Sequence, residues 1–283
     1  MYDVEKENGW SNSIIIRWKL IYLVLILWAL LALIFGIYDL QISIEVTSWT
    51  MIPGAIGNFI KTFGEFGADY GEGPSWGLIF VAIAILIGSI SKNYKKQIIP
   101  AIVIVVLFGV LLCLGIILSS EDLIWYGGFI STTVLIFLIL ILIRKYDMKK
   151  IRNLAWIIFL LAIINPLLFV NVLKPLCGRV RFRDLAPDFS NYTPWFLPPG
   201  PDFDNLSFPS GHTAMGWMFL PLLILFRNKK KGVKIITSFL IIGWGIFVGF
   251  SRIIVGAHYA SDVLFPTCVA FLTVIFLYKK FYF

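Results

Sequence analysis

The chain has 283 residues, of which 59% are hydrophobic and only 14% are charged, and its formal net charge is +8. Soluble domains use roughly 45–50% apolar and about 25% charged residues, so this composition excludes an ordinary soluble globule. No soluble segment carries a basic stripe with interleaved aromatic residues. We therefore expect the positive charge to reflect membrane orientation and anionic lipid, and not nucleic acid.

Runs near 20 apolar residues, the length that crosses a bilayer core, predict an all-α, polytopic bundle of about eight transmembrane helices. The predicted spans lie near 18–38, 75–91, 98–119, 123–143, 154–173, 211–226, 235–254 and 262–278. The first run is too long for a removable signal peptide. Residues 1–283 are therefore predicted to form a single integral membrane domain.

The distribution of basic residues predicts the orientation of this bundle. If the N-terminus is cytoplasmic and eight spans alternate, 18 of the 24 Lys and Arg residues fall on the cytoplasmic side. Such a bias is what the positive-inside rule requires. We therefore predict a multi-pass protein of the cell membrane with both termini in the cytoplasm.

Two predicted outward segments are long enough to have a role. Residues 39–74 carry apolar residues at helical spacing, which predicts a helix that lies in the membrane interface or packs against the bundle. These apolar residues are Ile52, Ile56, Phe59, Ile60 and Phe63. Residues 184–208 are rich in proline and aromatic residues, which predicts an ordered, non-helical loop at headgroup level.

The chain contains only two histidines, and each lies in a polar cluster beside apolar sequence. His212 ends Pro-Ser-Gly-His at the start of the sixth predicted span, and His258 lies between the seventh and eighth. A third polar cluster, 174–183, ends the fifth span. Ionisable groups at a membrane are costly and mark functional sites, and the alternation of spans brings all three clusters to the outward face.

These clusters have the chemistry of a phosphate site. Arginine offers a planar fork and lysine a point charge for phosphate oxygens, and a small-residue helix start offers free backbone N–H groups. One histidine can attack phosphorus while the other protonates the leaving oxygen. Asp262, four residues after His258, can reach the same helical face and fix the imidazole tautomer. The candidate phosphate-binding residues are Lys174, Arg181, Ser210, Gly211 and Arg252.

The motifs Lys-x6-Arg, Pro-Ser-Gly-His and Ser-Arg-x5-His-x3-Asp, in this order, resemble the signature of the type 2 phosphatidic acid phosphatase superfamily, membrane-bound branch. The resemblance covers about 154–278, the expected catalytic core, and implies a six-helix phosphatase core with extra N-terminal helices. It implies that His258 forms a phosphohistidine, that Asp262 orients it, and that His212 is the general acid. It also implies that no metal or cofactor is needed.

The first motif departs from the family pattern. It usually ends Arg-Pro, often within Gly-Arg-Pro-Arg-Pro, whereas Val180 and Phe182 occupy the two proline positions here. Without the fixed backbone angle of proline we expect a loop of different shape, in which Arg183 could compete with Arg181 for phosphate.

The sequence therefore predicts a membrane phosphatase that removes phosphate from a lipid phosphomonoester or diphosphate at the outer surface. Phosphatidic acid, phosphatidylglycerophosphate and polyprenyl diphosphate are the candidate substrates, and the bilayer is the other expected partner. The sequence does not fix the oligomeric state. A phosphotransferase, a sugar-phosphate phosphatase and an anion transporter remain alternatives. The transporter would need broken helices, for which the candidates are Pro166, Pro221 and Pro266.

Single residues also have purely structural interpretations. Lys174 could snorkel from a helix end, and His212 could be an ordinary interfacial histidine. Ser210 could be only an N-cap, and Asp262 could cap the last helix while also serving His258.

Overall fold

The computed structural model describes residues 2–89 and 148–283, and within these ranges every regular element is helical. Five runs there are long and apolar enough to cross a membrane, and Gly211–Phe226 is a shorter apolar helix. The long runs are Lys19–Met51, Ala55–Ser89, Lys149–Asp184, Lys231–Ile254 and Ala260–Tyr282. The all-α prediction is confirmed for the described residues. The predicted spans 98–119 and 123–143 lie outside them, so the total of eight stays a prediction.

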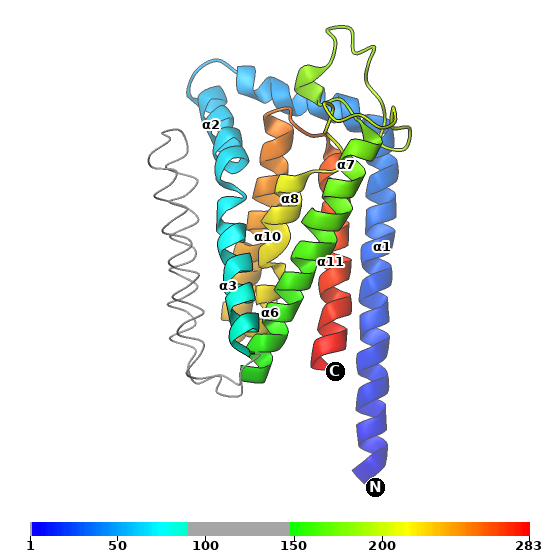
Figure 1. Cartoon of the computed structure of the whole chain (residues 1–283), viewed down its shortest axis with the longest axis vertical. Helices are drawn as coiled ribbons and strands as arrows, with labels where there is room; N and C mark the ends of the chain where they lie inside the picture. Colours follow the sequence, from blue (N-terminus) through cyan, green and yellow to red (C-terminus); the bar gives the residue numbers. More distant parts are fainter. Residues whose placement is uncertain (1, 90–147) are drawn as a thin grey trace.

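The first helix is longer than predicted. α1 (Tyr2–Ser48) continues past residue 38 and is followed by the 3-10 turn η1 (Trp49–Met51). It runs along one side of the bundle, packs against α11 and crosses the upper end (Figure 1). The prediction ended this span at 38 because Asp39 interrupts the apolar run, but Asp39 is fully buried and hydrogen-bonded. A paired, buried carboxylate therefore lies within the helix and does not mark its end.

The segment predicted as an interfacial or packed helix is packed against the bundle. α2 (Ala55–Tyr70) descends along α10 and leads into α3 (Gly73–Ser89) (Figure 1). Of its apolar side chains, Ile56 and Phe59 point away from the bundle and are 65% and 68% exposed, whereas Ile60 packs near Ile254 and the Phe63 ring lies 4.6 Å from that of Phe247 on α10. The opposite face carries glycines, and a Cβ on Gly64 would lie 2.5 Å from Cγ2 of Ile254. Small residues let helix backbones approach closely, so glycines make this contact together with part of the predicted apolar face.

The C-terminal half contains most of the bundle. It comprises α6 (Met148–Ala162), the π-helical segment η2 (Ile163–Val170), α7 (Asn171–Cys177), the 3-10 turn η3 (Phe182–Asp184), α8 (Gly211–Gly216), the 3-10 segment η4 (Trp217–Leu222), α9 (Leu223–Phe226), α10 (Lys231–Ile254) and α11 (Ala260–Tyr282). Two of the three predicted helix-breaking prolines, Pro166 and Pro221, lie in η2 and η4, where the helix departs from α geometry. Proline removes a backbone donor and favours such departures. Pro266 lies inside a continuous α11.

The main apolar core joins α3, α6, η4 and α11. Its fully or nearly fully buried members include Leu78, Ala82, Ile158, Leu161, Met218 and Ala270. A buried polar contact lies beside this core, between η2 and α11. Nδ2 of Asn165 donates to the carbonyl of Pro266 at 3.0 Å. This contact holds the π-helical segment against α11.

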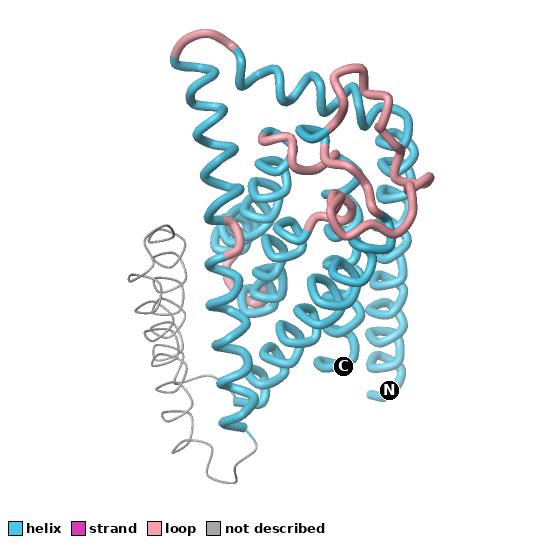
Figure 2. The backbone as a smooth tube through the Cα atoms, turned by 45° about the horizontal axis from the view of Figure 1, so that its top comes forward, coloured by secondary structure: helices cyan, strands magenta, loops and turns pink. Residues whose placement is uncertain are grey.

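The two termini lie at one end of the bundle, and the loop that follows α7 lies at the other end (Figure 1). Residues 185–210 form no α-helix, as predicted, and fold over that end as a long loop (Figure 2). Trp195 fixes the loop, because its Nε1 donates to the carbonyl of Ala32 at 3.0 Å and its ring packs 4.7 Å from that of Phe265. The loop and the site motifs thus share the end opposite the termini.

Candidate active site

The first motif lies on the last turn of α7 and the loop that follows it. Lys174 is in that turn, and Gly178 ends the helix in the left-handed conformation with φ +56°. A Cβ there would lie 2.1 Å from the carbonyl oxygen of Gly200, so glycine is required for conformation and for space. Arg181 follows in an extended conformation.

Aromatic packing fixes the loop where the family pattern has proline. The ring of Phe182 stacks on Phe189 at 6.2 Å and meets Tyr259 edge-on at 6.3 Å. The backbone N–H of Arg183 donates to the carbonyl of Gly256 at 2.9 Å, which ties this loop to the turn after α10. The Arg183 side chain is about half exposed and lies 3.8 Å from Asp184. Arg183 therefore borders the site from outside.

The second motif begins α8. Ser210 is its N-cap, and its hydroxyl oxygen accepts from the backbone N–H of Thr213 at 3.3 Å and from the Thr213 hydroxyl at 2.9 Å. Ser210 is fully buried, so the N-cap interpretation describes its side chain in this structure. Its contact with phosphate stays a prediction. A Cβ on Gly211 would lie 3.9 Å from Nζ of Lys174, which places the second motif beside the first.

His212 has a carboxylate partner that the sequence did not indicate. Its Nδ1 lies 2.9 Å from Oε1 of Glu72, in the turn between α2 and α3. An imidazole that donates from Nδ1 to a carboxylate presents Nε2 to its surroundings. Glu72 also interacts electrostatically with Lys174 and Arg252, so the α2–α3 turn is part of the same cluster.

His258 is 2% exposed and lies between α10 and α11. Burial lowers the pKa of His258 from its ordinary value to about 4, and the charges of Arg252 and Lys174 act in the same direction. The imidazole is therefore neutral at neutral pH and keeps a nitrogen lone pair. Its Nδ1 lies 3.5 Å from Oδ2 of Asp262, which is longer than a hydrogen bond. Such contacts often tighten only when substrate binds.

Asp262 is fully buried in the first turn of α11 and accepts several hydrogen bonds. Oδ2 accepts from the hydroxyl of Ser207 at 2.5 Å and from the backbone N–H of Tyr259 at 3.0 Å. Oδ1 accepts from Nη1 of Arg179 at 2.7 Å. Asp262 therefore caps α11 and faces His258 at the same time.

The three predicted cations come together around these histidines. Lys174 interacts electrostatically with Arg181 and Arg252. Arg252 ends α10 and donates from Nη1 to the carbonyl of Ala68 at 3.2 Å. Within the described residues, Nε of Arg181 and of Arg252 are buried and donate to no protein atom. Buried guanidinium donors of this kind suit an anionic ligand.

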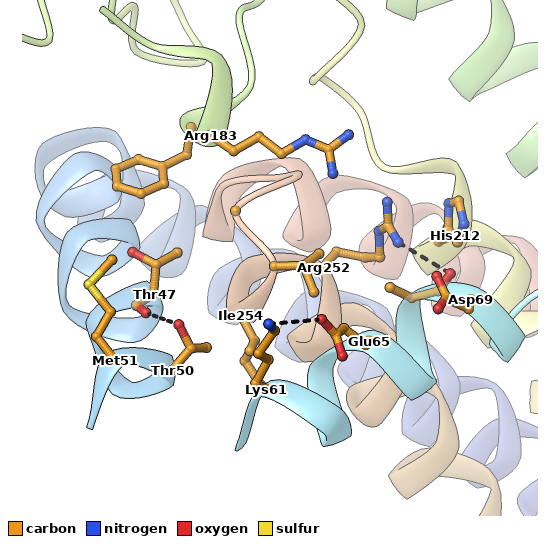
Figure 3. A pocket seen from close by; sticks show the side chains of 14 residues that line it. Thr47, Thr50, Met51, Lys61, Glu65, Asp69, Arg183, His212, Arg252 and Ile254 are labelled. Atoms are coloured by element: carbon orange, nitrogen blue, oxygen red, sulfur yellow. Dashed lines mark hydrogen bonds and ion pairs between the residues drawn. The ribbon is translucent and has the colours of Figure 1, made fainter. Parts of the chain in front are cut away.

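Two openings of different polarity reach the cluster. A cavity of about 710 Å³ is bordered by Arg183, His212 and Arg252, with Lys61, Glu65 and Asp69 from α2 (Figure 3). A second opening, a groove of about 350 Å³, lies between α3 and η2 and reaches Glu72 and Gly211. Its apolar lining includes Trp76, Ile79, Phe159, Ala162, Ile163, Pro166 and Leu167.

Three charged residues of the cluster were missed by the sequence analysis. Asp39 had a signal, because a carboxylate beside an apolar run marks a functional candidate. Arg179 lies within the first motif at a position that Lys-x6-Arg does not specify, while Glu72 had no periodic or motif signal. No group of three or more His, Cys, Asp and Glu side chains that could hold a metal occurs in the part of the chain that the structure describes.

Comparison with known proteins finds a family model and several relatives that match the C-terminal part of the chain. Residues 154–283 match the family model described as PAP2 superfamily. The chain is 40% identical over 81 residues to undecaprenyl-diphosphatase BcrC of Bacillus subtilis (strain 168), covering 29% of this chain and 38% of that protein. It is 35% identical over 98 residues to lipid A 1-phosphatase of Rhizobium etli, covering 34% of this chain and 38% of that protein.

A third relative is phosphatidylglycerophosphatase B of Haemophilus influenzae, which is 34% identical over 79 residues, covering 26% of this chain and 33% of that protein. The chain thus spans less than two fifths of the length of each of these relatives. No solved structure matches it.

Proposed function

We propose that this chain, whose residues 154–283 match the PAP2 superfamily model, is a membrane phosphatase that hydrolyses a phosphomonoester or diphosphate of a lipid. The observation that carries the proposal is a pair of histidines, each beside its own carboxylate, among three cations at one end of the bundle. The similar proteins support the reaction class, because each is named as a phosphatase of a lipid phosphate or diphosphate.

The reaction we propose has two steps. Lys174, Arg181 and Arg252 hold the phosphoryl oxygens, and a nitrogen of neutral His258 attacks phosphorus. The bond from phosphorus to the leaving oxygen breaks as His212 donates its proton to that oxygen. Neutral His212 then accepts a proton from water as the water attacks the phosphohistidine, which releases phosphate and restores both histidines.

The two carboxylates have different places in this scheme. Glu72 pairs with Nδ1 of His212 at 2.9 Å, which leaves Nε2 as the nitrogen that donates the proton. Asp262 stabilises the positive charge that develops on His258 as the phosphohistidine forms. We also propose that both termini are cytoplasmic and that the active site is on the outer face of the membrane, because the basic residues of the sequence are biased in this way.

Release of inorganic phosphate by the detergent-solubilised protein tests the proposal. We expect turnover of at least one of phosphatidic acid, phosphatidylglycerophosphate and a polyprenyl diphosphate, and the panel identifies which. A transporter would bind these anions and release no phosphate. A phosphotransferase would transfer the phosphoryl group to an added alcohol and would release correspondingly less free phosphate. Either result would replace hydrolysis as the activity.

The apolar groove supports a lipid as the substrate, because a hydrocarbon chain lying between α3 and η2 would bring its headgroup to Gly211 and Glu72. Replacing Leu167, which lines the groove, with tryptophan is expected to raise KM for a long-chain lipid about tenfold, since the larger ring fills the groove. Turnover of water-soluble p-nitrophenyl phosphate should stay unchanged. Steady-state kinetics with both substrates measure the difference.

Leu168→Trp is the matched control for this experiment. Leu167 and Leu168 are 54% and 53% exposed and adjacent on the same helix, but Leu168 does not line the groove. Equal effects of the two substitutions on the lipid KM, or an equal loss with p-nitrophenyl phosphate, would show that the groove does not hold the lipid chain.

A further inference from the structure

A buried ionic network meets Asp262 at Oδ1, the carboxylate oxygen that does not face His258. It joins Asp39 on α1, Arg179 in the first motif, and Ser261 and Asp262 at the start of α11. The side chains of Asp39, Arg179 and Asp262 are all at most 1% exposed. Asp39 comes from outside residues 154–283, the part of the chain that matches the family model.

Arg179 is fixed on every side. Its Nη1 donates to Oδ1 of Asp262 at 2.7 Å and to the hydroxyl of Ser261 at 2.8 Å, and its Nη2 donates to Oδ2 of Asp39 at 3.0 Å. Its Nε donates to the carbonyl of Thr193 in the long loop at 2.9 Å. The guanidinium carbon also lies 3.9 Å from the centre of the Tyr259 ring. The guanidinium is therefore held in one orientation.

Asp39 holds the other end of the network. Oδ1 accepts from the backbone N–H of Ser261 at 3.0 Å, and Oδ2 accepts from the Ser261 hydroxyl as well as from Arg179. The first turn of α11, which carries Asp262, is thus anchored to α1 through both backbone and side chain. A buried charge without such partners would cost several kcal/mol, and here each charge has them.

The two oxygens of the Asp262 carboxylate have different partners. Arg179 occupies Oδ1, while Oδ2 lies on the side of His258, 3.5 Å from its Nδ1. Oδ2 also accepts from Ser207 and from the backbone N–H of Tyr259, so loss of the Arg179 bond to Oδ1 would let the carboxylate tilt about these two contacts and would shift the oxygen that faces His258. The phosphorus-attacking nitrogen would lose its orientation with it, because the two ring nitrogens are fixed together.

We propose that Asp39 and Arg179 are positioning residues, which act through Asp262 to orient the imidazole of His258. This inference rests on the proposed function, in which His258 is the nucleophile. It assigns a role in the reaction to the first helix, which contributes no motif of its own. The competing interpretation is that the network only joins α1 to the bundle.

Asp39→Asn tests the proposal, because asparagine keeps the shape and one acceptor but removes the charge that pairs with Nη2 of Arg179. We expect kcat to fall about tenfold to a hundredfold, the range typical when outer partners that orient an imidazole are lost, with KM within about twofold. In the Asp262→Asn background the same change should lower kcat by less than about twofold, since residues that act as a unit are not additive. An equal fold-loss in both backgrounds would mean that Asp39 acts only on the fold.

Ser43→Ala is the matched control. Ser43 is also fully buried on α1, one turn after Asp39, and its hydroxyl makes no hydrogen bond to the network. It should leave kcat unchanged. If Asp39→Asn does not fold, Ser261→Ala replaces it, because this change removes one partner of Asp39 and one of Arg179 without altering charge. It should show a smaller kcat loss with the same non-additivity, and additivity would overturn the proposal.

The histidine content of the chain allows a second readout that needs no activity. With ¹⁵N-labelled histidine, only His212 and His258 give ring signals. Asp39→Asn should shift the signals of His258 and leave those of His212 in place. Unchanged His258 signals overturn the inference. If the wild-type protein hydrolyses no substrate, the proposed function fails by itself, and this measurement still decides whether Asp39 orients His258.

Discussion

His258→Ala is expected to lower phosphate release by at least about a thousandfold, since removal of a nucleophile leaves only binding and electrostatic catalysis. The structure gives this residue the properties that the role requires: it is neutral at neutral pH because of its burial, and it lies beside Asp262 and among the cations. Initial rates with the best lipid of the panel measure the effect.

The same variant can be tested for the covalent intermediate. Wild-type protein mixed with substrate labelled in the phosphate and quenched in alkali, in which phosphohistidine survives, should retain label on the chain. His258→Ala should retain none, while its elution volume and thermal unfolding temperature stay close to those of the wild type. Residual activity near the wild-type level, or label on the alanine variant, would remove His258 as the nucleophile.

His212→Ala is expected to have an effect that depends on the leaving group. With a lipid alkoxide, a poor leaving group, loss of the general acid should lower kcat by about a hundredfold to ten-thousandfold. With p-nitrophenyl phosphate, whose leaving group needs no proton, the reduction of the first step should be below about tenfold. Comparison of burst and steady-state rates for the two substrates separates leaving-group departure from hydrolysis of the intermediate.

Glu72→Gln is the companion of this variant. It keeps a hydrogen-bond acceptor for Nδ1 of His212 but removes the carboxylate charge beside the ring, so its effect should lie between those of the wild type and His212→Ala and follow the same dependence on leaving group. An equal loss for both leaving groups would instead make His212 a phosphate-binding residue.

The motif residues could be predicted because their chemistry is local in the sequence. His258 and Asp262 are one helical turn apart, and Ser210, Gly211 and His212 are consecutive, so spacing alone indicates which groups can cooperate. The same holds for the fold class, since a run of apolar residues near 20 long has few structural solutions. The loop at 184–208 could also be predicted from the sequence, because repeated proline excludes regular helix.

The residues that support the motifs could not be predicted in this way. Asp39 and Glu72 reach the site from elements more than 130 residues before their partners, and no spacing rule links them to Ser261 or His212. The apolar spacing of 52–63 predicts a helix, which the structure has from Ala55 onward, but the glycines of α2 bring its backbone closest to α10. Local pattern fixes the type of an element, and tertiary packing decides which face is inside.

The two openings have a consequence for what happens after cleavage. The groove beside Gly211 is apolar, while the cavity beside Arg252 carries charged side chains. In the proposed reaction, we therefore expect the dephosphorylated lipid and the inorganic phosphate to depart by separate routes, one back into the bilayer and one into water. On this proposal neither product has to pass the other, and a whole lipid need not be extracted from its leaflet.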